Sequence, residues 1–376
     1  MKNSGVVSRE RAAWEICALA CCIAINAAHA QTVTEVPRSR SYVAAGVFEE
    51  NGQLHFERAP QPAVETLGNW HVMGSPVGEL IGLGRRAGDG GTEVRVLNRA
   101  GTQVGTAAIP RGRVGVVTDR GVIALEEALH GPARSHDVLF YSLSGMLLRQ
   151  ASEPTLRIVK WSAAKNGSLV TVNDEPNTDR KTIVVYAPDG QPAWRYARGG
   201  SAYPDVLVTP DNQRLVIVEQ DVWASTAQLT VLAPGNQVLQ TQPLPNVYRL
   251  VASDSSDKIA AVGQHVAALL DARTGKLLWR QDKDIDLVLP GGLQFDPTGQ
   301  RLLIVAANRD RSAGVSRLNL WTLDAADGAA QRAELGKGPL DEAPQVLGIS
   351  TVPTGEQQIV LHDRLINVAP GALQAQ

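Results

Sequence analysis

A tight turn containing glycine recurs along the chain at a nearly constant interval, and this period constrains the fold more than any other feature. Successive glycines of the series lie 44, 45, 45, 40, 53 and 43 residues apart in the 376-residue sequence. The series consists of Gly101, Gly145, Gly190, Gly235, Gly275, Gly328 and Gly371. In the clearest repeats, 183–197 and 267–281, the turn follows an aliphatic, β-branched run and precedes a short polar strand. This pattern is typical of β-hairpins.

A second series of turns keeps a fixed phase with the first. Its turns lie at 119–121, 166–167, 211–212, 255–256, 298–299 and 354–355, and each precedes an apolar run such as RLVIVE. Their Asp, Asn, Ser and Gly residues suit left-handed or locally hydrogen-bonded backbone. Two interleaved turn series exclude helical repeats and disfavour a sandwich. A period in the forties therefore predicts an all-β propeller, with one four-stranded sheet, or blade, per repeat.

The ends of the chain bear on the number of blades. Only residues 372–376 follow Gly371, so the last repeat lacks an outer strand. A strand-like segment at about 42–58 precedes the first full repeat, and it can supply that strand and close the ring. We predict a seven-bladed β-propeller closed by this N-terminal strand. The alternative is an eight-bladed propeller, in which 42–59 belong to an incomplete extra blade.

Residues 1–30 have the features of a signal peptide. Basic residues precede an apolar stretch at 12–28, and residues 28–30 read Ala-His-Ala, which fits a small-x-small cleavage site. A membrane anchor is disfavoured because the stretch is short and contains Glu15 and Asn26. We expect cleavage after residue 30.

This cleavage would leave an N-terminal linker at 31–41 and a single propeller domain at 42–376. All three cysteines lie in the leader, so the mature chain offers no disulfide or thiol nucleophile. We predict a periplasmic or secreted protein with no transmembrane segment in the mature chain. An alternative is a lipid anchor at Cys21, because residues 19–21, Leu-Ala-Cys, are similar to part of a lipoprotein cleavage box.

The charge pattern bears on the kind of partner. The net charge is −2, from 36 basic and 38 acidic residues that are interspersed along the chain. Binding of nucleic acid calls for a basic face, which this pattern does not supply. We expect a monomer whose partner is a periplasmic or envelope protein or peptide, and no nucleic-acid partner.

Two repeats resemble known propeller families. Residues 271–279, DARTGKLLW, resemble the blade-ending turn of PQQ-type propellers, and residues 295–303, FDPTGQRLL, resemble the turn of Tol-system and WD-like propellers. Other repeats carry Gly105, Arg149 or Leu239 where the PQQ-type repeat has tryptophan. The resemblance implies a propeller over nearly the whole mature chain. It also implies PQQ as one alternative to a protein without a cofactor, and loop carboxylates make Ca²⁺ the other.

The loops between the second and third strands of the blades carry the candidate binding residues. Such loops ring the central funnel of a propeller and commonly carry function. The candidates are Arg85, Arg86, Glu126, His136, Asp174, Arg180, Trp223, Arg309, Asp310, Arg311, Asp363 and Arg364. Their charges can also be explained as solvated groups that pair with one another. The 53-residue step of the glycine series contains the loop 308–314, so we expect any specialised blade there.

Metal and catalytic signals are weak. Glu126, Glu127, His130 and His136 occur close together but on a predicted loop, and Asp174 with Glu175 could supply oxygen ligands to Ca²⁺. The sequence contains no G-x-S-x-G elbow, H-E-x-x-H pair or phosphate-binding glycine loop. We predict no metal site, and the sequence identifies no catalytic residue.

We therefore favour an exported, non-enzymatic binding scaffold that docks a protein or peptide through its loop face. Two enzymatic alternatives stay open at this point. One is a PQQ-dependent dehydrogenase, and the other is a metal-using propeller hydrolase or lyase.

Overall fold

The computed structural model describes most of the chain from residue 32 onward. The described residues are 32–35, 40–44, 46–57, 64–65, 70–73, 75–77, 79–88, 90–110, 113–130, 133–152, 157–175, 177–200, 203–221, 226–339, 344–352, 355–361 and 364–376. The predicted signal peptide at 1–30, including Cys21, lies outside them. No helix within these ranges is long and apolar enough to cross a membrane.

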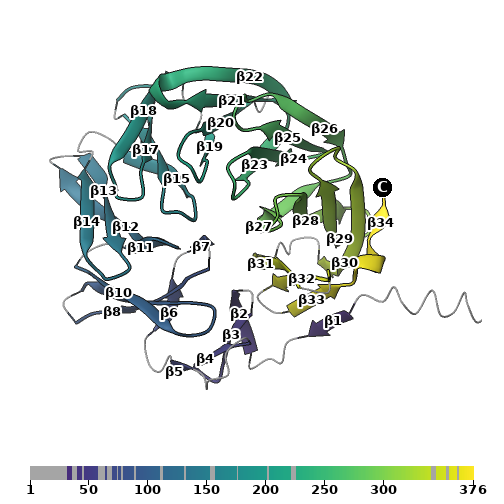
Figure 1. Ribbon diagram of the computed structural model, residues 1–376, viewed down its shortest axis with the longest axis horizontal. Coiled ribbons are helices and arrows are strands. Elements are labelled where there is room, and N and C mark those ends of the chain that lie inside the picture. The colour runs from purple at the N-terminus through teal and green to yellow at the C-terminus, as the bar shows by residue number, and fades with distance from the viewer. Residues whose placement is uncertain are drawn as a thin grey trace, which may run out of the picture.

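Eight β-sheets are arranged as a ring around a central axis (Figure 1). Blade 1 contains β2 (Arg40–Ala44), β3 (Val47–Glu50), β4 (Gln53–Phe56) and β5 (Val64–Glu65). Blade 2 contains β6 (His71–Met73), β8 (Ile81–Arg86), β9 (Thr92–Leu97) and β10 (Gln103–Ile109). Blade 3 contains β7 (Ser75–Val77), β11 (Arg113–Thr118), β12 (Gly121–His130), β13 (Ala133–Ser142) and β14 (Leu147–Ser152). Blade 4 contains β15 (Arg157–Ala163), β16 (Leu169–Asp174), β17 (Arg180–Tyr186) and β18 (Pro192–Gly199).

The second half of the ring follows the same order from inner to outer strand. Blade 5 contains β19 (Asp205–Val208), β20 (Leu215–Asp221), β21 (Thr226–Ala233) and β22 (Gln237–Pro245), with the 3₁₀ helix η1 (Pro234–Asn236) before β22. Blade 6 contains β23 (Val247–Ala252), β24 (Lys258–Gly263), β25 (Val266–Asp271) and β26 (Leu277–Asp282). Blade 7 contains β27 (Leu287–Phe295), β28 (Arg301–Asp310), β29 (Val315–Asp324), β30 (Ala330–Pro339) and β34 (Gln374–Ala375). Blade 8 contains β31 (Val346–Thr351), β32 (Gln357–Leu361), β33 (Arg364–Val368) and β1 (Thr32–Glu35).

The all-β propeller is confirmed, but the prediction of seven blades is wrong and the eight-bladed alternative is right. The glycine series missed blade 1 because the connection between its third and fourth strands, 57–63, contains no glycine. Blade 1 is built from the residues that were predicted to seal a seven-bladed ring. Its β2 and β3 form a hairpin in which Ser41 pairs with Glu49.

The ring is closed by β1, which lies in the segment predicted as a linker and not in 42–58. β1 runs antiparallel to β33, with register partners from Thr32↔Asn367 to Glu35↔Arg364 (Figure 1). Gly371, the last glycine of the series, lies in the 3₁₀ helix η2 (Pro370–Ala372) instead of a hairpin. The strand that follows it, β34, pairs with β30 of blade 7.

The middle strands of each blade form the core because neighbouring blades cover both of their faces. All five residues 169–173 of β16 are buried, and five of the six residues of β24 are buried, so these strands are apolar without alternation. Outer strands such as β14 are largely exposed. Between blades 6 and 7 the core includes Leu269, Ile304 and Trp321.

An antiparallel blade places its turns at two opposite ends. The turns between first and second strands and between third and fourth strands lie at one end, which we call the glycine-turn face. The turns between second and third strands, with the connections from one blade to the next, lie at the other end, which we call the hairpin face. The members of the glycine series from Gly101 to Gly328 all have φ between +72° and +81°. Their turns are therefore of the left-handed kind that favours glycine.

Candidate functional site

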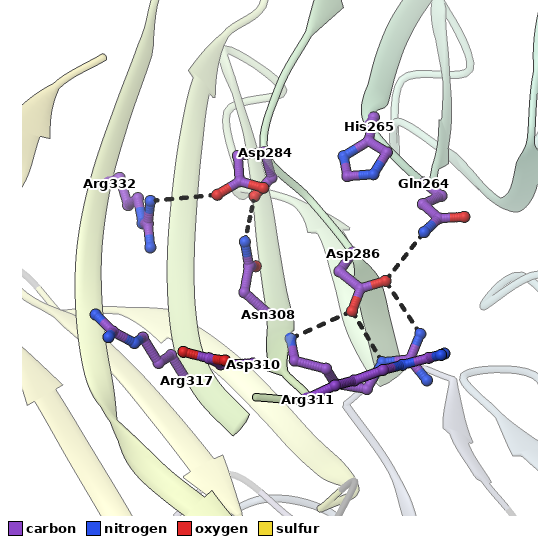
Figure 2. A pocket seen from close by; sticks show the side chains of 10 residues that line it. Gln264, His265, Asp284, Asp286, Asn308, Asp310, Arg311, Arg317 and Arg332 are labelled. Atoms are coloured by element: carbon purple, nitrogen blue, oxygen red, sulfur yellow. Dashed lines mark hydrogen bonds and ion pairs between the residues drawn. The ribbon is translucent and has the colours of Figure 1, made fainter. Parts of the chain in front are cut away.

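A polar groove of about 610 Å³ lies between blades 6 and 7 on the hairpin face (Figure 2). The β24–β25 turn of blade 6 borders one side, and strands β28, β29 and β30 of blade 7 form the other. The connection from β26 to β27 lies between them. The groove is lined by Gln264, His265, Asp284, Asp286, Asn308, Arg309, Asp310, Arg311, Arg317 and Arg332.

The groove arises from hairpins of unequal length. β24 and β25 have 6 residues each, whereas β28 and β29 have 10 residues each. The blades are aligned at the glycine-turn face, where Trp279 Nε1 donates a hydrogen bond of 3.1 Å to the carbonyl of Ala325. Four extra residues in each strand therefore extend blade 7 by about 13 Å beyond blade 6. The extended part of blade 7 is the wall of the groove.

An ion pair between Asp286 and Arg309 fastens this wall to the connection between the blades. The Asp286 carboxylate accepts hydrogen bonds from Arg309 Nε at 2.8 Å and from Arg309 Nη2 at 3.0 Å. It also accepts from the Arg309 backbone N–H at 3.2 Å and from Gln264 Nε2 at 3.1 Å (Figure 2). Gln264 belongs to the blade 6 turn, so this carboxylate links three segments of the groove.

The electrostatic effect of this pair is mutual. The hydrogen bond from Arg309 is the main cause that lowers the pKa of Asp286, and burial of the carboxylate opposes it. The same hydrogen bond raises the pKa of Arg309. Both groups are therefore charged at neutral pH and hold one another in place.

A second set of contacts orders the middle of the wall. Asn308 Nδ2 donates to the Asp284 carbonyl at 2.8 Å, and Arg332 Nε donates to Asn319 Oδ1 at 2.9 Å. The Arg332 guanidinium lies 4.0 Å from an Asp284 carboxylate oxygen and 5.2 Å from the ring centre of Trp321. Arg332 is thus positioned by contacts on blade 7 and projects toward the groove (Figure 2).

Asp310 stabilises the turn that it begins. Its carboxylate accepts hydrogen bonds from the Ser312 hydroxyl at 2.6 Å and from the backbone N–H groups of Ser312 and Ala313, each at 3.1 Å. The Ser312 hydroxyl is the main cause that lowers the pKa of Asp310. This carboxylate therefore serves the β28–β29 turn.

A smaller hollow of about 310 Å³ is formed by the inner strands of blades 4, 5 and 6. Its lining includes Trp161 and Arg249, and the ion pair of Lys160 with Asp205 measures 2.9 Å. Tyr248, which also lines it, accepts a hydrogen bond of 2.9 Å from the Val288 N–H beside the groove. Burial is the main cause that raises the pKa of Tyr248. The Tyr248 hydroxyl also donates a hydrogen bond of 3.4 Å to the carbonyl of Asp286, a residue of the groove.

The predicted residues of the β28–β29 hairpin meet in the groove. Arg309, Asp310 and Arg311 all line it, although Arg309 and Asp310 lie at the end of β28 and not in a loop. Their role in binding stays a prediction.

The other predicted residues lie on different blades, away from this groove. Arg85 pairs with Glu93, with its Nε 2.7 Å from a carboxylate oxygen, and stacks on Trp70 at 4.8 Å. Arg86 is exposed at the end of β8. Asp174 pairs with Lys181 at 2.6 Å, and Arg180 is exposed at the start of β17.

The prediction of a loop at 126–136 is wrong. β12 continues through His130 and β13 begins at Ala133, so Glu126 lies in a strand opposite Asp137. The run of apolar residues between the charges, including Ala128 and Leu129, continues the strand pattern that we interpreted as a loop. Similarly, Arg364 lies in β33 opposite Glu35.

Three predicted features fall outside what the structure describes. Trp223 and Asp363 are not among the described residues, and for His136 only the backbone is described, in β13. Within the described part of the chain no three His, Cys, Asp or Glu side chains are grouped as metal ligands. Glu175, which we considered for Ca²⁺, accepts a hydrogen bond of 2.9 Å from Thr182.

Sequence reasoning missed four charged residues of the groove: Asp284, Asp286, Arg317 and Arg332. The first two lie in the connection between blades, and the others lie within strands of blade 7. One signal was available, since residues 282–286 read DKDID immediately before an inner strand. The sequence alone does not place Arg317 and Arg332 at the groove, because their placement depends on the strand register of blade 7.

Comparisons with known structures confirm the fold. The chain is similar to the C-terminal WD40 domain of Sif2, at 12% identity and a TM-score of 0.51, over 91% of this chain and 97% of that chain. It is also similar to a eukaryotic initiation factor, at 12% identity and a TM-score of 0.52, over 93% and 89% of the two chains. No family model matches the sequence, and curated proteins give no match. The resemblance to WD-like repeat propellers is thus confirmed as a fold.

Proposed function

We propose that this protein is a non-enzymatic binding scaffold that docks a protein or peptide partner in the groove between blades 6 and 7. The observation that carries the proposal is the step between the two hairpins, whose exposed wall is lined by ordered polar side chains. The Asp286–Arg309 ion pair and the self-capped β28–β29 turn fix the backbone of this wall. A site that is ordered before binding loses less conformational entropy when the partner docks.

The shape of the site favours a polypeptide as the occupant. The groove is open along a wall about 13 Å long, a length that matches roughly four residues of an extended chain. Its lining is predominantly charged or amide-bearing, whereas small-molecule pockets are mostly apolar and enclosed.

The proposed site of action is outside the cytoplasm, and the proposed acting form is a monomer. The charged start, apolar stretch and Ala-His-Ala site of residues 1–30 support export. N-terminal sequencing of protein recovered from the periplasm or medium tests this part. A start at Gln31 is the expected result, and an intact leader on cytoplasmic protein contradicts it.

Site-specific photo-crosslinking in cells tests the docking function. A photoreactive benzoylphenylalanine replaces Ala313, which is exposed on the β28–β29 turn, or Lys276, which is exposed at the opposite end of blade 6. We expect one discrete protein adduct from position 313 and none from position 276. Equal adducts from both positions, or no adduct from position 313, contradict the proposal.

A further inference from the structure

We propose that the docking segment of the partner is acidic, and that its Asp or Glu carboxylates pair with Arg311, Arg317 and Arg332. This inference rests on the docking function proposed above, and it names the chemistry that the groove recognises. The inference follows from a difference in pairing: most carboxylates of the groove have strong partners within the fold, whereas three of its arginines do not.

Two of the three carboxylates in the groove are occupied by internal contacts. Asp286 accepts four hydrogen bonds, three of them from Arg309, and Asp310 accepts three from its own turn. Asp284, the third, is 67% exposed, and its only ion-pair contact among the described residues is the 4.0 Å approach of Arg332. The internal acids therefore leave most of the guanidinium donors of the groove unused.

The arginines have more donors than these acids satisfy. Arg311 is exposed, and its guanidinium makes no hydrogen bond or ion pair within the described part of the chain. Among the residues that the structure describes, Arg317 has one ion-pair contact, 3.9 Å from Glu334, with both side chains more than 40% exposed. A pair of that kind contributes little in water, so the guanidinium is available to another carboxylate. Arg309 is excluded from this set because Asp286 holds it.

The strand register places Arg317 and Arg332 on one wall. Arg317 on β29 lies opposite Asn308 on β28, and Arg332 on β30 lies opposite Trp321 on β29. Positions 317, 319 and 321 share one face of β29 because side chains alternate along a strand. At the glycine-turn end this face is apolar and packs on blade 6 through Trp321, with Arg332 beside it on β30, and above the step it carries Arg317.

Arginine on such a wall favours carboxylates of an extended segment. A guanidinium offers donors in a planar fork that fits a carboxylate in a bidentate manner. Side chains on one face of an extended peptide repeat about every 6.8 Å, so one segment can present more than one carboxylate to the wall. A single small anion would satisfy only one of the three arginines.

The test measures fluorescence anisotropy of a labelled octapeptide of glutamate with the full mature chain, beside an octapeptide of glutamine. We expect the glutamate peptide to bind at least tenfold more tightly and to weaken as salt is raised. Arg311→Glu is expected to weaken it roughly tenfold or more, whereas Arg311→Lys keeps the charge and costs about threefold. Lys276→Glu, with the same change in net charge at the opposite face, is expected to stay within about twofold.

Three results would overturn the inference: equal binding of the two peptides, equal losses in Arg311→Glu and Lys276→Glu, or full displacement by free glutamate at the same carboxylate concentration. Thermal unfolding shows whether Arg311→Glu is folded. We expect an unchanged melting temperature, because the Arg311 side chain is exposed. A specific adduct from position 313 without a preference for glutamate refutes only the acidic chemistry. Preference for glutamate without any adduct refutes the docking function and leaves an anion-binding groove.

Discussion

Blades 6 and 7 share the same strand order and the same turn chemistry at the glycine-turn face, yet they differ by four residues in each strand of the middle hairpin. At the shared end, Gly275 and Gly328 have φ of +72° and +76°, and each turn packs on the outer strand of the preceding blade. At the other end the short hairpin of blade 6 leaves the wall of blade 7 uncovered. The repeated turns therefore maintain the ring at one face, whereas a local difference in hairpin length creates the candidate site at the other.

The largest effects on stability are expected at the shared end. Gly275→Ala would place a Cβ 2.8 Å from Gln240 Cβ, and Gly328→Ala would place one 2.9 Å from Gln281 Cγ. Left-handed backbone and overpacking together cost about 3 kcal/mol at each position. Denaturant unfolding should show similar losses in the two variants. A free energy of unfolding equal to that of the wild type in either variant would show that the two glycine turns are not packed equally tightly.

A smaller effect on stability is expected at the Asp286–Arg309 ion pair, which joins blades 6 and 7 in the groove. Asp286→Asn removes the charge that holds Arg309 and should lower the free energy of unfolding by about 1–2 kcal/mol at neutral pH. Asp282→Asn is the control, because Asp282 is 75% exposed and its one ion pair within the described residues is with the nearby Arg280. That change should cost less than about 0.5 kcal/mol.

The contribution of Asp286 should depend on pH in one direction. Because its pKa is lowered in the folded protein, its stabilising effect is present above the ordinary value of 3.8 and is lost as pH falls through the lowered value. The stability difference between wild type and Asp286→Asn should therefore shrink as pH falls below 3.8. A difference that grows as pH falls would contradict this sign.

The turn that exists only in the long hairpin should tolerate change better than the shared turns. Gly314 has φ of +65°, but an added Cβ would meet no atom within 4 Å. Gly314→Ala should therefore cost only the backbone strain, about 1 kcal/mol. Its unfolding, measured beside that of Gly328→Ala, separates strain from packing. Equal losses in the two would contradict the difference between the faces.

The smallest effect on stability is expected at Arg311. Because its side chain is exposed on the extended part of blade 7, Arg311→Glu should change the free energy of unfolding by less than about 0.5 kcal/mol. The same variant should lose binding of the glutamate octapeptide. A destabilised variant would show that Arg311 belongs to the scaffold instead of the site.

The sequence predicted the propeller because its turns depend on local chemistry. Left-handed glycines and the aspartates that cap their turns, such as Asp271 with Thr274, recur at a readable spacing. The glycine spacing did not predict blade 1, because the connection between its third and fourth strands lacks glycine. The closing strand β1 is recognisable only from its pairing with β33.

The site was predictable only in part, for a related physical reason. The adjacent steps of 40 and 53 residues marked blades 6 and 7, and Arg309–Arg311 were identified from their hairpin. Asp286 and Arg332 are brought to the groove by a connection and by an outer strand, so their meeting depends on blade packing and register. No local pattern encodes that packing.

Hydrogen exchange of residues 31–376 with and without the glutamate octapeptide tests whether an acidic segment docks at the step between blades 6 and 7. We expect protection at the two sides of the step together, in 264–265 with 283–286 and in 308–317, and unchanged exchange at the turns 271–276 and 324–329. Protection at the glycine-turn face, or none in the groove at a saturating peptide concentration, would contradict this expectation.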